Sequence, residues 1–494
     1  SMPADKTFRL RGATSAAAHP PVSEVAITSA SSVTQGAARG AAVGELEMPA
    51  DAVVRVVLAN GFVLWSRADD LLRERGRQAT ARSGVDGAPV WEVSMGPRPG
   101  MPTRGSARGR LGLDVKLMEV FGVDLKEKTA RELARALEDR QLKAGAPGLY
   151  HCPLALAEAA APGPWLTPVA DGAIMPADAG PILVFVHGTG SSCSGSFGKL
   201  WAPRNRAGEA LRGKLLERYG ERVLALEHRT LTESPIANAL ALARALPAGA
   251  EIHLVSHSRG GLVGELMCLG QRDAASDPLQ APLLRDLFAA DRTVAEQLGL
   301  PALGPDSASE RDKAYEDDRK ALLELLTELD AKKFNIRRFV RVACPARGTT
   351  LASGRLDRWL SVVDFLSGTG LFGECLDFLL AVVKLRTDPR VLPGIEAMMP
   401  GSALTRLLQH PDLSVSADLS VIAGDIEGET LGGQLKLLAV DWFYGADHDL
   451  VVNTGSMFGG LRRPPGQSRF LRDVGADVNH FNYFTNEKSV KWLL

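Results

Sequence analysis

The sequence has few cysteines and no long apolar run. Its five cysteines are scattered along 494 residues, with no C-x-x-C pair and no zinc-type spacing of cysteine and histidine. Such a sparse, odd set excludes a disulfide framework and predicts free thiols in a reducing compartment, so we expect a cytoplasmic protein. No run approaches the roughly 20 apolar residues of a membrane span. A basic start followed by an apolar core is also missing, which argues against a signal peptide.

An excess of charge of either sign is missing as well. Lysine and arginine number 57 against 58 aspartate and glutamate residues, which gives a net charge of −1. This balance predicts no nucleic-acid partner and no strong attraction to an anionic membrane surface. The apolar content of 45% is ordinary for a globular protein, and the length favours two structural units over one.

The clearest motif that is present surrounds Ser258. Residues 251–257, with Ile252, Leu254 and Val255 among them, predict a buried strand, and a helix-like segment follows them. Between the two, the order S-x-S-x-G from Ser256 to Gly260 resembles the G-x-S-x-G nucleophile elbow, with serine in place of the first glycine. That turn needs small side chains because strand and helix pass closely, and serine is nearly as small as glycine. We therefore predict that Ser258 is a nucleophile, with Ser256 as the alternative.

A second motif precedes the first along the chain. The apolar run at 181–186 predicts a strand buried on both faces, and it leads into H-G-T-G at 187–190. A strand that ends in H-G-x-G is typical of an oxyanion loop, and an ordinary glycine-rich turn is the alternative. We predict that the backbone N–H groups of Thr189 and Arg259 face the oxyanion. Four neighbouring residues are expected to line the substrate-binding site: His187, Gly188, Gly190 and His257. The other hydroxyl groups near these motifs are expected to be structural: those of Ser191, Ser192 and Ser256.

These two motifs resemble those of the α/β-hydrolase superfamily, in its serine lipase and esterase branch. In that superfamily the acid follows the nucleophile along the chain and the histidine comes last. Of nine histidines, His480 is the one near the C-terminus, so it is the predicted base. Asp449 begins a D-x-V-V sequence that resembles the acid loop of lipases, and we rank it first as the acid. Asp447 ranks second, and Asp425, which follows a strand-like run, ranks third.

A third segment narrows the resemblance. Residues 344–349 read C-P-A-R-G-T, which is similar to the T-P-H-x-G-[ST] segment of many lipases, with Ala346 where a histidine is common. The chain is most similar to the lipase-like group that includes the GPI-inositol-deacylase-like proteins. It also resembles bacterial hydrolase domains that lie beside signalling modules. The resemblance covers roughly residues 175–494 and leaves the first 160 unexplained.

The resemblance implies an α/β fold with a mostly parallel central sheet flanked by helices, and a two-step acyl transfer without metal or cofactor. His480 would accept the Ser258 proton as the serine attacks an ester carbonyl, and Asp449 would orient His480. The substrate would be a small-molecule or lipid ester. An amidase, thioesterase or acyltransferase with the same residues is one alternative, and a non-catalytic interaction or effector domain is another. The sequence does not indicate the oligomeric state.

Composition divides the chain into three parts. We expect an N-terminal accessory α/β region at 1–165, a linker rich in alanine and proline at 166–180, and the hydrolase domain at 181–494. Within the accessory region, two apolar runs around Ala59-Asn60 predict a β-hairpin at 52–65. A charged stretch at 117–143 predicts a helix.

Two insertions interrupt the predicted hydrolase domain. The first, at 270–337, is charged and helical, and the second, at 352–416, is more apolar. The second contains two short apolar segments, 360–366 and 376–383, which predict helices. These helices either pack into the core or form a lid over an acyl pocket. As a lid they would set the substrate preference and offer a peripheral contact with lipid.

Overall fold

The computed structural model divides the chain into two compact units. The first comprises residues 1–133, 355–387 and 429–447, and the second comprises residues 134–354, 388–428 and 448–494. The structure describes the following residues: 7–16, 26–34, 44–58, 63–78, 90–93, 115–125, 129–142, 146–152, 166–169, 179–201, 206–273, 305–348, 380, 382–384, 391–425, 457–474, 484, 490 and 493.

The first unit is built on a sheet of eight described strands. Seven follow the order β5-β4-β8-β2-β1-β7-β6, and β3 pairs with β1 off this path. Every pairing is antiparallel except that of β1 with β7. The elements are β1 (Thr7–Ala16), β2 (Ala26–Thr34), β3 (Gly44–Pro49), β4 (Val53–Leu58), β5 (Val63–Arg67), α1 (Ala68–Arg75), β6 (Gly76–Gln78), β7 (Val90–Val93) and β8 (Val115–Asp124).

Two predictions for the N-terminal region have different outcomes. The predicted hairpin is confirmed, because β4 and β5 pair antiparallel on either side of the turn. The predicted helix at 117–143 is wrong over its first part, where the chain forms β8 between β4 and β2. Val120, Phe121 and Val123 of β8 are buried, and β-branched and aromatic residues suit a strand inside a sheet. The charged helical pattern belongs to α2 (Thr129–Gln141) alone.

The second unit is built on another sheet of eight described strands, in the order β10-β9-β12-β11-β13-β14-β15-β16. From β12 to β16 all neighbours are parallel, whereas β9 pairs antiparallel with both β12 and β10. The strands are β9 (Gly148–His151), β10 (Thr167–Pro168), β11 (Ile182–Val186), β12 (Val223–Glu227), β13 (Glu251–His257), β14 (Asn335–Val342), β15 (Leu419–Asp425) and β16 (Ser468–Val474).

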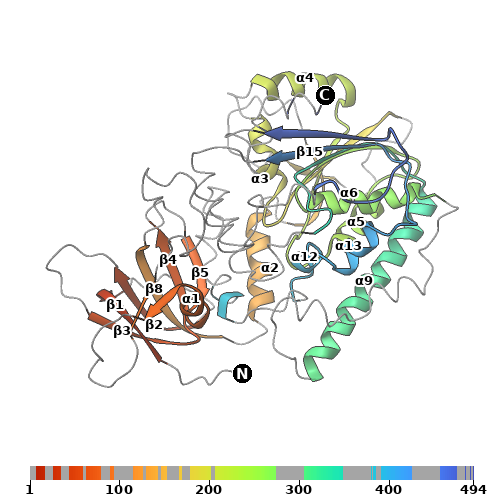
Figure 1. The fold of residues 1–494 in the computed structure, drawn as a ribbon. Helices are drawn as coiled ribbons and strands as arrows, with labels where there is room; N and C mark the ends of the chain where they lie inside the picture. The colour runs from red at the N-terminus through yellow and green to blue at the C-terminus, as the bar shows by residue number, and fades with distance from the viewer. Residues whose placement is uncertain are drawn as a thin grey trace. The chain divides into compact units, whose positions relative to one another are not determined.

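Helices cover both faces of this sheet. Figure 1 shows α4 on one side and α5, α6 and α9 on the other. Every residue of β11 and β12 is buried, as expected of strands between two helical layers. The predicted fold class is therefore confirmed: a mostly parallel sheet flanked by helices, with the α/β-hydrolase fold. The helices are α3 (Cys193–Phe197), η3 (Gly198–Trp201), α4 (Arg206–Tyr219), α5 (Pro235–Ala245), α6 (Gly260–Cys268), η4 (Leu269–Gln271), α9 (Pro305–Lys332), α12 (Pro393–Glu396) and α13 (Ala403–Leu408).

The second unit begins earlier in the chain than the expected boundary. It starts at Ala134, and β9 hydrogen-bonds to β12 well before residue 181. The stretch expected as a linker, 166–180, contains β10. Strands of two and four residues are too short to show a periodic pattern, so composition alone gives no sign of them.

The described parts of the two insertions are helical. In the first, α9 lies against α5 and buries Leu322, Leu325 and Leu329, so its apolar stripe is less solvated than its composition suggests. The strand β14 already begins inside the range expected for this insertion. In the second, α12 and α13 are described. The predicted helices at 360–366 and 376–383 lie outside the described residues apart from 380, 382 and 383.

A buried ionic cluster ties β14 and α6 to the segment before β16. Arg341, Glu265 and Arg463 all have side chains that are at most 1% exposed. Glu265 Oε1 accepts a hydrogen bond from Arg341 Nη1, and Glu265 Oε2 lies 3.2 Å from Arg463 Nη1. Arg341 Nη2 also donates to the carbonyl oxygen of Met457 at 2.8 Å. The unit therefore holds two buried cations on one carboxylate.

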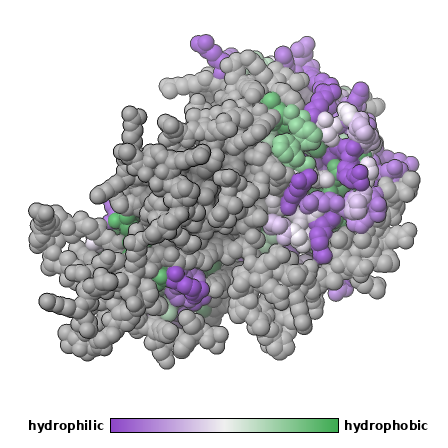
Figure 2. Space-filling view, viewed as in Figure 1, coloured by the Kyte–Doolittle hydropathy of each residue, from purple (hydrophilic) through white to green (hydrophobic). Residues whose placement is uncertain are grey.

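The visible described surface of the second unit is largely hydrophilic, with a small apolar patch (Figure 2). Exposed large apolar side chains include Phe458 and Phe470, whose rings pack edge to face at 5.3 Å. Among the residues that the structure describes, no helix is long and apolar enough to cross a membrane.

Candidate active site

Ser258 occupies a tight turn between β13 and α6. Its φ is 52°, in the left-handed region that a residue with a side chain adopts at a cost of about 1–3 kcal/mol. Two hydrogen bonds hold the turn: Ser258 N donates to Val342 O at 2.8 Å, and Gly261 N donates to Ser258 O at 2.9 Å. This is the strand–turn–helix geometry of a nucleophile elbow, as the sequence predicts.

Small residues are required on both sides of the turn. A Cβ atom at Gly260 would lie 2.6 Å from the carbonyl oxygen of His187, so α6 could not approach β11 with a larger residue there. Ser256 is fully buried, and its hydroxyl has no hydrogen-bond partner in the part of the chain that the structure describes. Ser258 retains 8% exposure, so a substrate can reach Ser258 more readily than Ser256.

The loop after β11 lies directly against the elbow. A Cβ atom at Gly188 would lie 2.8 Å from the Cβ of Ser258 and 3.2 Å from the carbonyl oxygen of His257. Gly190 has a φ of 59°, a left-handed conformation that favours glycine. The H-G-x-G glycines therefore allow the loop to turn and to touch the serine.

Some backbone N–H groups of this loop and of the elbow donate hydrogen bonds within the described residues, and others do not. Gly190 N donates to Thr230 Oγ1 at 2.8 Å, and Cys193 N donates to Glu227 Oε1 at 2.9 Å. In contrast, the N–H groups of Thr189 and Arg259 make no hydrogen bond within the described residues. These are the two groups that the sequence predicts as oxyanion donors; Arg259 follows Ser258 in the chain, and Thr189 follows Gly188, which packs against Ser258.

The Arg259 side chain is fully buried and turns into the protein. Its Nη1 donates to Asn238 Oδ1 at 2.9 Å, and its Nη2 donates to Glu233 O at 2.6 Å. Its Nε donates to Gly394 O at 3.3 Å. Burial lowers the pKa of Arg259 to about 10, so the guanidinium stays charged at neutral pH. These contacts fix the backbone of the residue that follows Ser258.

The side chain of His187 supports the same loop from the protein interior. The ring is fully buried, and its Nδ1 lies 3.0 Å from Gly188 O while its Nε2 accepts a hydrogen bond from His228 N at 3.2 Å. Burial lowers the pKa of His187 to about 3, so the imidazole is neutral. Burial also raises the pKa of Glu227 to about 7, and its Oε2 lies 3.4 Å from His187 Nε2. Because His187 is neutral, this contact is not an ion pair.

The C-terminal segment returns to the elbow at Phe484. The Phe484 ring packs edge-on against His257 at 5.6 Å and against Phe197 at 4.9 Å. Phe484 follows the predicted base His480 by four positions in the sequence. His480, Asp449 and Asp447 lie outside the described residues. Asp425 ends β15, and its backbone alone is described.

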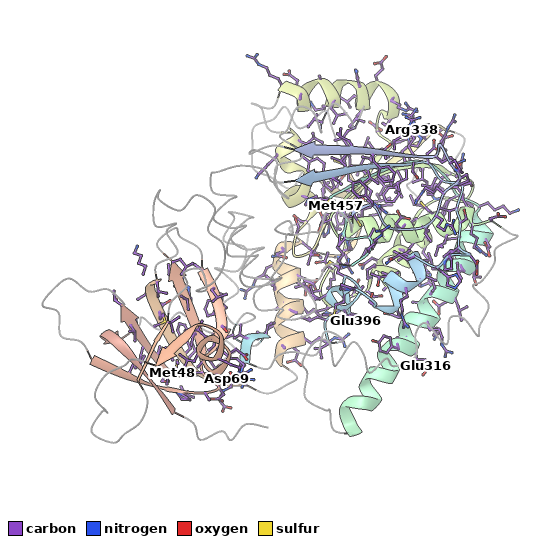
Figure 3. The ribbon with its side chains drawn as sticks, in the orientation of Figure 1. Met48, Asp69, Glu316, Arg338, Glu396 and Met457 are labelled. Atoms are coloured by element: carbon purple, nitrogen blue, oxygen red, sulfur yellow. The ribbon has the colours of Figure 1, made fainter. Side chains whose placement is uncertain are left out.

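Two further segments reach the site without any sequence signal. Thr189 Oγ1 donates to Met398 Sδ at 3.4 Å, so the described part of the second insertion lies on the oxyanion loop. Tyr315 Oη of α9 donates to Oε1 of Glu396, the last residue of α12, at 3.0 Å (Glu396 is labelled in Figure 3). In the part of the chain that is described, no three metal-ligating side chains gather in one place.

Comparisons with known proteins add a family and remote structural matches. A family model described as "Domain of unknown function (DUF7379)" matches residues 154–281 and 319–494. No curated protein matches. Solved structures that match include mature lipase BlEst2 of Bacillus licheniformis, at 15% identity over 63% of this chain and 89% of that one, with a TM-score of 0.27.

Two other structural matches are equally remote. The RedJ thioesterase of the prodiginine pathway in Streptomyces coelicolor matches at 13% identity over 68% of this chain and 96% of that one, with a TM-score of 0.27. Esterase B of Lactobacillus rhamnosis matches at 14% over 74% and 91%, with a TM-score of 0.26. Similarity at this level does not bear on the reaction.

Proposed function

Because the chain belongs to the family described as a domain of unknown function (DUF7379), we propose its function from the site itself: a serine hydrolase that cleaves carboxylic esters. One observation carries the proposal. Ser258 stands in a left-handed turn with a φ of 52° and packs against Gly188, and the N–H groups of the next residues, Thr189 and Arg259, have no partner within the described residues. A serine hydroxyl beside backbone N–H donors that are free to bind an oxyanion is the arrangement that acyl transfer needs.

The proposed reaction forms and then cleaves an acyl-enzyme. Ser258 Oγ attacks the ester carbonyl carbon as His480 accepts the hydroxyl proton, and Asp449 orients and stabilises the imidazolium. The N–H groups of Thr189 and Arg259 hold the oxyanion. The ester C–O bond then breaks, and the leaving alcohol takes the proton from His480. Water attacks the acyl carbonyl carbon as His480 accepts its proton; the bond to Ser258 Oγ then breaks, the acid leaves, and His480 returns the proton to Ser258 Oγ.

The choice of His480 and Asp449 rests on chain order and on one contact. Phe484 packs on His257, which supports a path of the C-terminal segment close to the elbow. In the parallel sheet, β15 and β16 follow β14 in order, so segments after these two strands start at the sheet edge from which Ser258 projects. Asp425, at the end of β15, stays the alternative acid on the same argument.

We propose that the second insertion, 352–416, helps to set substrate preference. Its described part contacts the oxyanion loop through Met398 and Thr189, and Gly394 of α12 accepts a hydrogen bond from Arg259. Methionine is flexible and adapts to apolar groups of different shape. An acyl chain is therefore the substrate part that we expect here, on a small-molecule or lipid ester. The resemblance to GPI-inositol-deacylase-like proteins favours a lipid ester.

A substrate panel tests this proposal. Matched p-nitrophenyl esters, thioesters and anilides of short and long acyl chains would be offered to the parent chain and to Ser258→Ala. We expect turnover of esters above the other classes, and a loss of at least about 10⁴-fold in Ser258→Ala with an unchanged unfolding midpoint. Preference for thioesters or anilides would reassign the reaction, and equal turnover by both chains would contradict the nucleophile.

A further inference from the structure

The segment that follows β12 contacts Gly190, the neighbour of the proposed donor Thr189, and Arg259, the other proposed donor. We call residues 228–234 the bridging loop. At one end, Thr230 Oγ1 accepts a hydrogen bond at 2.8 Å from the backbone N–H of Gly190, the residue directly after Thr189. At the other end, Glu233 O accepts the hydrogen bond from Arg259 Nη2 at 2.6 Å. The bridging loop therefore fixes the backbone next to each donor.

A single carboxylate from α2 holds this bridging loop. Glu138 Oε1 accepts hydrogen bonds from the N–H groups of Thr230 and Leu231, each at 2.5 Å. Its Oε2 accepts from Thr232 N at 3.2 Å and from Thr232 Oγ1 at 2.6 Å. Glu138 is 2% exposed. Three consecutive backbone N–H groups thus converge on one buried acceptor, a geometry that selects an anion.

The bridging loop depends on this carboxylate for its shape. Without an acceptor, three buried N–H groups would be unsatisfied, at about 1–3 kcal/mol each, so the loop would turn toward water. On its other side, Gly394 is packed so tightly on Thr230 that a Cβ atom there would overlap the Thr230 carbonyl group. The bridging loop therefore has one well-packed position, between α12 and Glu138.

We propose that Glu138 is a positioning residue for the oxyanion loop, acting through Thr230 on Gly190 and so on the Thr189 N–H group. The inference rests on the proposed function, because it assigns Glu138 a part in that reaction. The inference also adds a residue outside the family match to the residues that support the reaction, because Glu138 lies before residue 154, where the match to the family model begins. The orange helix α2 in Figure 1 is thereby part of the site's support.

The variant Glu138→Gln tests this role. A carboxamide has one accepting oxygen, so its NH₂ group must face either the N–H groups of Thr230 and Leu231 or that of Thr232. We expect kcat per active site, titrated with a fluorophosphonate, to fall about tenfold or more, with KM within about twofold, because a displaced donor acts on the transition state. The control is Glu132→Gln, which removes the same charge from an exposed position in the first turn of α2; its kcat should not change.

Thr230→Val gives a second test if Glu138→Gln does not fold. It keeps the side-chain shape and removes the acceptor of the Gly190 N–H group, so the same fall in kcat at constant KM is expected. An unchanged kcat per titrated site in Thr230→Val, or in a folded Glu138→Gln, would overturn the inference. Absence of both turnover and labelling in the parent chain would instead overturn the proposed function on which the inference rests.

Discussion

Gly188 and Ser258 are in such close contact that a single methyl group does not fit between them. A Cβ atom at Gly188 would lie 2.8 Å from the Cβ of Ser258, well inside van der Waals contact. The oxyanion loop and the nucleophile elbow are therefore one packed assembly, although they come from separate strands. A change at either residue must displace the other.

Gly188→Ala should reduce activity strongly. The added methyl group would push the loop from Ser258 and move the Thr189 N–H group, so we expect a loss of about 10²-fold in kcat. Overpacking should cost about 1–3 kcal/mol of unfolding free energy. Ester turnover and urea unfolding measure the two effects. The control is Gly213→Ala in α4, where an added Cβ has no neighbour within 4 Å; this variant should keep full activity. Equal activity of the two variants would mean that the loop and the serine are not coupled.

Glu265→Ala should destabilise the second unit severely. The substitution leaves the buried guanidinium groups of Arg341 and Arg463 without their shared carboxylate. Removing one partner of a buried ion pair costs about 3–5 kcal/mol. Glu324→Ala, which breaks an exposed pair with Arg244, should cost under about 1 kcal/mol. Urea unfolding of both variants provides the comparison, and similar losses would argue against a buried ionic cluster.

Glu227 should make stability fall with rising pH between about 4.5 and 7. Burial raises the pKa of this carboxyl group from 4.5 to about 7, so the folded state holds a proton that the unfolded state has already lost. The contribution of this protonated carboxyl group to the free energy of unfolding is full below pH 4.5, declines up to pH 7 and is absent above that. Glu227→Gln should remove this slope and gain up to roughly 3 kcal/mol relative to the parent chain at pH 8.

The comparison must use the difference between the two chains, because His187 contributes with the opposite sign. Its pKa is lowered from 6.5 to about 3, so its contribution is lost as the pH falls. In Glu227→Gln the amide oxygen can keep the hydrogen bond from Cys193 N. Unfolding curves measured from pH 5 to pH 8 should converge at the acid end; a constant offset between the chains would contradict the raised pKa.

Local features of the site could be predicted from the sequence. The elbow is one such feature, because its strand, turn and helix are consecutive and each residue around Ser258 has a steric reason. The H-G-x-G loop is another, since Gly188 and Gly190 are required by contacts and by a left-handed φ at fixed positions in the motif. The buried strand β11 is also predictable, because a continuous apolar run indicates it.

Features that depend on residues far apart in the chain could not be predicted. Arg259 and Gly394 are 135 positions apart, and Thr189 and Met398 are 209 apart. A sequence gives no sign of such pairings, because in each pair only Arg259 or Thr189 belongs to a motif and its partner does not. The role of Glu138 could not be predicted for the same reason, because in the sequence it is one of several charged residues of a helix. The strand β8 is hidden because a charged helix follows it closely and dominates the pattern. The places of His480 and Asp449 stay predictions.

The most direct test of the account is whether Ser258 is an activated nucleophile. A fluorophosphonate probe would be added to the native parent chain, to Ser258→Ala and to Ser256→Ala, and the modified peptide would be identified by mass spectrometry. We expect a covalent adduct on Ser258 in the parent chain and in Ser256→Ala, and none in Ser258→Ala. An adduct that persists in Ser258→Ala, or no adduct on any of the three chains, would contradict the central claim.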